Sequence, residues 1–310
     1  MHLIVPFASP LSEVGRQALL TLKLPQLDAL LARLGPMARD DGDEYALSPP
    51  HERALARALG LAGADGQLPW AAWLAERDGI DTHGDLAWGL LTPVHWQVAS
   101  DHIRLTDPAA LALDEAGSRA LLAVVHELFE SEGFAVLWGA PERWYLVHES
   151  LRDLPTASLD RVIGRSLDPW LPQGPQARRL RRLQNEVQMQ LFEHPLNEAR
   201  EAQGQLPLNS FWLSGCGLRQ AAAPGLPVVD DRLRSAALAE DWGSWIAAWQ
   251  ALDAGPVAAA LAALRRGEAV TLDLCGERSA VQWASRPPSL WQRLQRTLRP
   301  TPALALLQTL

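Results

Sequence analysis

Short apolar segments alternate with helical segments along this chain, and that alternation limits the folds open to it. Apolar runs of strand length occur at residues 3–7, 210–213, 227–230 and 269–274. Leucines recur at helical spacing between the first two, most clearly over residues 14–34, where Pro25 is expected to divide the helix. Strands separated by helices tend to pair in parallel with the helices packed on the sheet. The sequence therefore predicts an α/β fold with a mostly parallel sheet flanked by helices.

The middle of the chain follows a different pattern. Residues 134–138 and 143–147 are apolar and are separated by a short Gly/Pro turn, which predicts a β-hairpin. We therefore expect an α/β core made of residues 1–90 and 200–310, with a smaller inserted α+β lobe at residues 91–199. The helices expected in that lobe cover residues 114–130 and 176–193.

Other assignments follow from local composition. Residues 35–50 and 194–210 are polar and are expected to form loops, and Gly215-Cys216-Gly217 is expected to form a turn. Residues 288–298 are expected to form a helix and residues 303–307 a terminal strand.

Composition excludes several classes of protein. The chain has 310 residues and a formal net charge of −8, which argues against broad nucleic-acid binding because such binding depends on phosphate neutralisation. We find no uninterrupted apolar run of bilayer length and no leader-like pattern at the start, so we expect no membrane span. Two cysteines are too few for a disulfide framework. We expect a reduced, cytoplasmic protein.

Three local patterns have a structural and a functional interpretation. Trp242, Trp245 and Trp249 share one helix face and form either a core stripe, which we favour, or a surface that docks a protein partner. His126 begins a His-Glu-Leu-Phe-Glu run that lacks the second histidine of a zincin, so we reject a zinc protease. Cys216 has no sequence neighbour that would activate a thiol.

Segment 194–217 is the most specific part of the sequence. Its imidazole, amide and guanidinium groups can donate hydrogen bonds to a phosphate or carboxylate, and its glycines permit close backbone approach. It forms either an anion-binding loop or a structural corner. The candidate ligand-binding residues are His194, Asn197, Arg200, Asn209, Gly215 and Gly217.

The motif in this segment, His-Pro-x-Asn-x-x-Arg-x-x-x-Gly-x-x-Pro-x-Asn followed by an apolar strand and Gly-x-Gly, resembles archaeal-type cofactor-independent phosphoglycerate mutases of the alkaline phosphatase superfamily. Residues 24–30 and 228–231 are weakly similar to other superfamily segments. The whole chain resembles a bacterial group described both as phosphoglycerate-mutase-like and as RpfE-type regulatory proteins. The resemblance implies an alkaline-phosphatase-like α/β fold with an inserted lobe.

The same resemblance implies two divalent metals, Mn or Zn, and a phosphorylated Ser or Thr. This sequence departs from that pattern, because no aspartate precedes Asp28 and no histidine follows His194. We therefore expect no catalytic residue, no metal and no cofactor. An oxygen-only metal site from Asp230, Asp231 and Asp273 is the alternative.

These observations lead to one expected function and two rivals. We expect a phosphoglycerate-mutase-like protein without the two-metal site, acting as a non-catalytic regulatory protein that binds a phosphorylated or carboxylated metabolite. The first rival is an active metal-dependent phosphoglycerate mutase or phosphatase with a rearranged site. The second is an interaction protein that uses the tryptophan helix.

Overall fold

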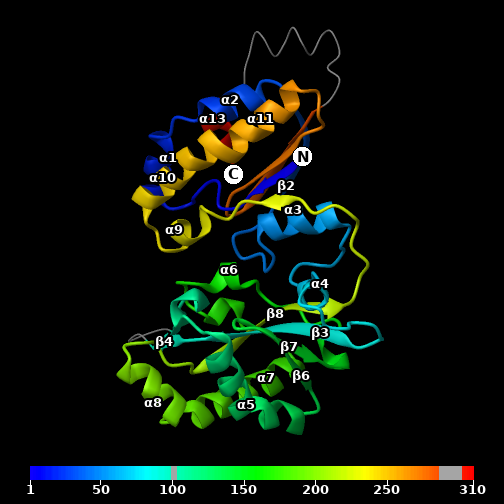
Figure 1. The fold of residues 1–310 in the computed structure, drawn as a ribbon, viewed down its shortest axis with the longest axis vertical. Helices are drawn as coiled ribbons and strands as arrows, with labels where there is room; N and C mark the ends of the chain where they lie inside the picture. Colours follow the sequence, from blue (N-terminus) through cyan, green and yellow to red (C-terminus); the bar gives the residue numbers. More distant parts are fainter. Residues whose placement is uncertain (99–102, 286–301) are drawn as a thin grey trace. The chain divides into compact units, whose positions relative to one another are not determined.

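The computed structural model describes residues 1–98, 103–285 and 302–310. Figure 1 shows its ribbon, coloured along the sequence. The chain divides into two compact units, and each has its own sheet and its own helices. The helix expected at residues 288–298 lies outside the described residues.

The second unit is an insertion in the first. Unit 1 comprises residues 1–59 and 223–310, and unit 2 comprises residues 60–222. Unit 2 is longer at both ends than the lobe expected at residues 91–199. The difference arises because its sheet includes one strand that begins before that range, at Ala87, and another that lies after it, and strands that pair must belong to the same unit.

A five-stranded sheet forms the centre of unit 1, in the order β2-β11-β10-β1-β9. Strand β1 runs parallel to β10 and β9, whereas β11 is antiparallel to both β10 and β2. The sheet is therefore mixed, and the expectation of a mostly parallel sheet was wrong, because β10 returns directly into β11 as a hairpin. Its strands are β1 (His2–Val5), β2 (Gly35–Asp41), β9 (Val228–Val229), β10 (Thr271–Cys275) and β11 (Ser279–Ala284).

Helices cover both faces of this sheet (Figure 1). One face, which includes Leu3, Leu272 and Val281, packs on most of the helices in a single apolar core. The other face carries Ile4 and Cys275 and is covered by α3. The helices of unit 1 are α1 (Glu13–Leu20), α2 (Pro25–Leu31), α3 (Pro50–Leu59), α9 (Arg234–Leu238), α10 (Trp242–Leu252), the π-helical η4 (Asp253–Val257), α11 (Ala258–Arg265) and α13 (Ala303–Leu307).

The tryptophan stripe belongs to that core. Trp245 and Trp249 are fully buried, and the Trp245 indole donates a hydrogen bond to the Phe7 carbonyl at 3.0 Å. The core interpretation is confirmed for these two residues. The continuous helical segment Trp242–Arg265 is long and apolar enough to cross a membrane by length and composition alone. Here it packs into unit 1, and its buried Asp253 accepts hydrogen bonds from two backbone amides of α2.

Unit 2 is built on a four-stranded antiparallel sheet in the order β6-β7-β3-β8. Helices α5 and α7 contribute to the main core on one face, and α4 covers Trp88 and Tyr145 in a smaller apolar cluster. Strands β4 and β5 pair with each other in a separate two-stranded sheet. The strands of unit 2 are β3 (Ala87–Val94), β4 (Trp96–Val98), β5 (Ile103–Leu105), β6 (Ala135–Ala140), β7 (Arg143–Val147) and β8 (Ser210–Leu218). The helices are α4 (Trp70–Arg77), η1 (Pro108–Leu111), α5 (Glu115–Ser131), η2 (Glu149–Leu151), α6 (Leu159–Val162), η3 (Asp168–Trp170), α7 (Pro175–Leu191) and α8 (Pro195–Ala202).

Several expected elements are confirmed. Strand β1, the division of the first helical segment into α1 and α2, and the β6–β7 hairpin all lie where the sequence placed them. Helices α5 and α7 match the two long helices expected in the middle of the chain.

Other local assignments were wrong. Residues 35–41 form edge strand β2 because hydrogen bonding to β11 holds this mostly exposed segment, and a hydrophobic pattern does not reveal such pairing. Residues 303–307 form helix α13, in keeping with the strong helix propensity of Ala and Leu. The expected loop at 194–210 contains helix α8, which His194 caps and Pro195 begins.

Candidate functional site

The four polar residues proposed from sequence as ligand contacts lie at a corner of unit 2, where α7, α8 and the chain entering β8 meet, whereas the two proposed glycines lie near the other end of β8. Asn197, which is only 5% exposed, forms three hydrogen bonds with the backbone. Its amide nitrogen donates to the carbonyls of Leu191 (3.0 Å) and Leu208 (2.7 Å), and its carbonyl oxygen accepts from the Leu208 amide (2.9 Å). The side chain therefore joins the end of α7 to the chain entering β8.

The other polar residues of the corner are also bonded to the backbone. The Arg200 guanidinium donates to the carbonyls of Leu206 and Leu111, and burial lowers the pKa of this arginine. Asn209 binds Trp96 twice, accepting from its amide at 2.7 Å and donating to its carbonyl at 2.9 Å. The His194 ring accepts from the Leu196 amide at 3.3 Å.

The two glycines shape the strand rather than a turn. Gly215 and Gly217 lie inside β8, at a register shift opposite β3, and both have positive φ angles of 63° and 157°. A β-carbon on Gly215 would lie 2.9 Å from the β-carbon of Trp70. The expected glycine turn was therefore wrong, and these residues permit a β-bulge that lets α4 approach the strand closely.

The structure thus brings the polar residues of the motif together at one corner, where their side chains mostly bind the backbone, and leaves the two glycines near the other end of β8. Arg200 also borders a cavity of about 310 Å³ beside the start of α5, where Asp114 caps the helix by accepting from the Gly117 amide at 2.7 Å. The negative charge of the Asp114 carboxylate would repel an anion in this cavity. Ligand binding by the six residues stays a prediction.

The acidic residues considered for a metal site do not converge. The Asp230 carboxylate accepts hydrogen bonds from Nε and Nη2 of Arg232 at 2.6 and 2.8 Å. The Asp273 carboxylate is bound by His2 and Gln282. Within the described parts of the chain, no three His, Cys, Asp or Glu side chains are grouped to hold a metal. Asp230 and Asp273 therefore have separate sets of partners, and an oxygen-only metal site that includes Asp231 stays a prediction.

The remaining nucleophile candidates are structural. Cys216 is fully buried, and burial raises the pKa of its thiol to about 12. His126 lies 3.3 Å from Glu130 on the surface of α5, an ordinary pair one helical turn apart. The rejection of a zincin motif is consistent with this pairing.

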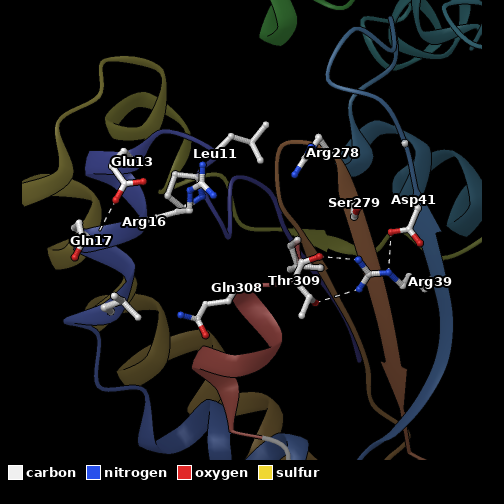
Figure 2. A pocket seen from close by; sticks show the side chains of 14 residues that line it. Leu11, Glu13, Arg16, Gln17, Arg39, Asp41, Arg278, Ser279, Gln308 and Thr309 are labelled. Carbon is white, nitrogen blue, oxygen red and sulfur yellow. Dashed lines mark hydrogen bonds and ion pairs between the residues drawn. The ribbon is translucent and has the colours of Figure 1, made fainter.

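A more polar cavity lies in unit 1, and we call it the arginine pocket (Figure 2). Its volume is about 540 Å³. Arg16 reaches it from α1. Arg278 lies in the turn before β11 and Ser279 begins that strand, while Gln308 and Thr309 directly follow α13. The charged residues that line it are Glu13, Arg16, Arg39, Asp41 and Arg278.

The position of the arginine pocket follows from the sheet. Pro10 and Leu11 lie shortly after β1, and Arg278 lies shortly after β10. Because β1 and β10 are parallel, their carboxyl ends meet at the same edge of the sheet. Ligands of open α/β sheets bind outside the carboxyl ends of the strands, so the pocket occupies the position at which such a fold binds small molecules.

Two sets of contacts fix the walls of the pocket. Arg39 donates from its Nε to Asp41 at 2.7 Å and from its terminal nitrogens to Thr309 Oγ1 and the Thr309 carbonyl at 3.1 and 2.6 Å. The Arg278 carbonyl accepts from the Arg53 guanidinium at 3.3 Å and from the Gly42 amide at 3.1 Å. The C-terminal segment and the turn before β11 are thereby held against β2.

The Arg53 side chain is itself positioned by Asp40. Burial alone would raise the pKa of Asp40, but the hydrogen bonds and charges of Arg53 and Arg57 outweigh it and lower that pKa below its ordinary value. Asp40 is therefore ionised at neutral pH, and the two ion pairs hold α3 to β2 next to the pocket.

Several donors in the arginine pocket are free. Across residues 1–98, 103–285 and 302–310, the side chains of Arg16, Arg278, Ser279 and Gln308 have no hydrogen-bond or ion-pair partner. Ser279 is nevertheless only 7% exposed. Guanidinium groups form strong, two-pronged hydrogen bonds with phosphate and carboxylate. The arrangement can bind an anion without breaking an existing contact of these four side chains.

Sequence reasoning did not find this site. Its three arginines come from α1, β2 and the turn before β11, so no local motif connects them. The sequence does contain one relevant signal, because one expected strand ends near Val5 and another near Cys275. If those two strands pair in parallel, the residues that follow them lie close together.

Comparison with known proteins gives limited information. No family model and no curated protein matches the sequence. One similar solved structure is the cofactor-independent phosphoglycerate mutase from Thermoplasma acidophilum DSM 1728, with 13% identity, a TM-score of 0.36, and coverage of 93% of this chain and 90% of that chain. Another is the PH0037 protein from Pyrococcus horikoshii, with 12% identity, a TM-score of 0.43, and coverage of 98% and 91%. Both TM-scores lie below 0.5, and we draw no conclusion about function from either structure.

Proposed function

We propose that this chain is a phosphoglycerate-mutase-like protein without the two-metal site, cytoplasmic and non-catalytic, that binds a phosphorylated or carboxylated metabolite in the arginine pocket and acts in regulation. The observation that carries the proposal is the pair of guanidinium groups, Arg16 and Arg278, which face a cavity at the carboxyl ends of β1 and β10 and have no partner among the described residues. The phosphoglycerate-mutase-like part of the proposal rests on the motif that begins at His194.

The chemistry of the pocket supports binding rather than phosphoryl transfer. Its hydrogen-bond donors can hold the oxygens of an anion, and Arg39 adds positive charge while it anchors Thr309. Transfer would in addition need an activated nucleophile, but Ser279 has neither a base nor a cation within hydrogen-bonding distance among the described residues. The partners of Asp230 and Asp273 also speak against the rival metal-dependent mutase or phosphatase.

Calorimetric titration of the purified protein with inorganic phosphate and 3-phosphoglycerate tests the proposal. A hydrogen bond to a charged group is worth about 1.5–3 kcal/mol, so Arg16→Ala or Arg278→Ala should weaken binding by about tenfold to a hundredfold. Arg265→Ala, which removes an exposed arginine of the same unit that does not line the pocket, should leave affinity unchanged. The proposal fails if neither anion binds at millimolar concentration.

A further inference from the structure

The arginine pocket contains more than positive charge. We propose that its ligand is a phosphorylated polyol, such as a sugar phosphate, rather than a bare anion or a nucleotide. This inference rests on the proposed function, because it specifies the ligand of the same site. It depends on the acceptors and neutral groups that share the cavity with Arg16 and Arg278.

Two carboxylates line the same cavity as the arginines. Glu13 accepts from Gln17 through Oε1 at 3.2 Å, and Asp41 accepts from Arg39 through Oδ1 at 2.7 Å. In the part of the chain that the structure describes, the second oxygen of each carboxylate has no other partner. A bare phosphate is repelled by these groups, whereas a hydroxyl group can donate a hydrogen bond to them.

Two neutral groups complete the set. The Ser279 hydroxyl, on a residue only 7% exposed, and the Gln308 amide both line the cavity, and neither side chain has a hydrogen-bond partner among the described residues. Each can both donate and accept, as the hydroxyl groups of a sugar do. A ligand hydroxyl group that bonds to Ser279 adds a hydrogen bond, so such a ligand is favoured over one that does not reach this residue.

The size and walls of the cavity limit the ligand further. A volume of about 540 Å³ lies within the usual range of about 300–1,000 Å³ for small-molecule pockets, so there is room for a carbon skeleton beside the phosphate. The described residues that line the cavity include no Phe, Tyr, Trp or His. A nucleobase would therefore lack an aromatic stacking partner, which in single-strand binding proteins contributes about 1–3 kcal/mol per base.

The test compares four ligands by calorimetry: ribose 5-phosphate, glucose 6-phosphate, inorganic phosphate and AMP. We expect at least one sugar phosphate to bind about tenfold or more tightly than inorganic phosphate. Each added neutral hydrogen bond contributes about 0.5–1.5 kcal/mol to binding, and about 1.4 kcal/mol in total corresponds to tenfold in affinity. Glu13→Gln should reduce that advantage severalfold while leaving phosphate affinity unchanged or higher, since a negative charge is removed. Glu268→Gln, on the surface of unit 1 and outside the pocket, is the matched control.

The other outcomes separate this inference from the proposed function. Equal affinity for sugar phosphates and inorganic phosphate, with both affinities lowered by Arg16→Ala, would overturn the inference and leave the anion site standing. Tightest binding of AMP would also overturn the inference. If none of the four ligands binds, both proposals are overturned.

Discussion

Replacing Asn197 with alanine should destabilise unit 2 strongly, even if this residue never contacts a ligand. The substitution removes three hydrogen bonds at a position that is 5% exposed. It leaves the Leu208 amide without its acceptor, at a cost of about 1–3 kcal/mol, and it removes two donor bonds worth about 0.5–1.5 kcal/mol each. The expected loss is therefore about 2–6 kcal/mol, a large part of the about 5–15 kcal/mol that usually stabilises a protein.

Two assays measure this loss. Urea denaturation followed by circular dichroism gives the change in the free energy of unfolding, and hydrogen exchange reports locally on the Leu208 amide, which should lose its protection. Asn185→Ala, an exposed asparagine on α7, is the matched control and should change stability by less than about 0.5 kcal/mol. A stable Asn197→Ala protein with a protected Leu208 amide would refute the interpretation of this corner as structural.

Two further predictions concern unit 1. Trp245→Ala removes a fully buried indole from the core and should cost about 3–5 kcal/mol in thermal or urea unfolding, whereas a variant of unchanged stability would show that the stripe is not core. Asp40 has a lowered pKa in the folded protein, so its ion pairs stabilise the fold above the ordinary carboxyl pKa of 3.8 and are lost as pH falls through the lower folded value. The stability difference between the natural protein and Asp40→Asn should accordingly be constant above about pH 5 and shrink below about pH 4, and a difference independent of pH would contradict this.

The parts of the fold that the sequence predicted are those with strong local signals. Pro25 divides α1 from α2, and the short turn between two apolar runs forms the β6–β7 hairpin. The capping Asp114 marks the start of α5, where it accepts from the Gly117 amide. In each case the residues that determine the element are neighbours in sequence.

The errors have the opposite origin. Strand β2 is exposed over most of its length and shows no apolar alternation, and only its pairing with β11, more than two hundred residues later, makes it a strand. The signal for α8 was present in His194-Pro195, a capping residue followed by a proline at the first helical position, but the density of polar residues favoured a loop.

The candidate site shows the same division. The motif at 194–217 is compact in sequence, yet its described polar side chains mostly bind backbone groups of the corner. The arginine pocket is dispersed over α1, β2, β11 and α13, and the tertiary structure alone brings its residues together. The sequence motif at 194–217 therefore stabilises a corner of unit 2, while the free hydrogen-bond donors lie in the arginine pocket of unit 1.

The most direct test of an anion site in the arginine pocket is to follow the arginine Nε–H signals by nuclear magnetic resonance during titration with inorganic phosphate. We predict saturable shifts at Arg16 and Arg278, with the signal of Arg200 unchanged. Saturable shifts at Arg200, with Arg16 and Arg278 unaffected, would contradict the account and place the anion in the corner that begins at His194.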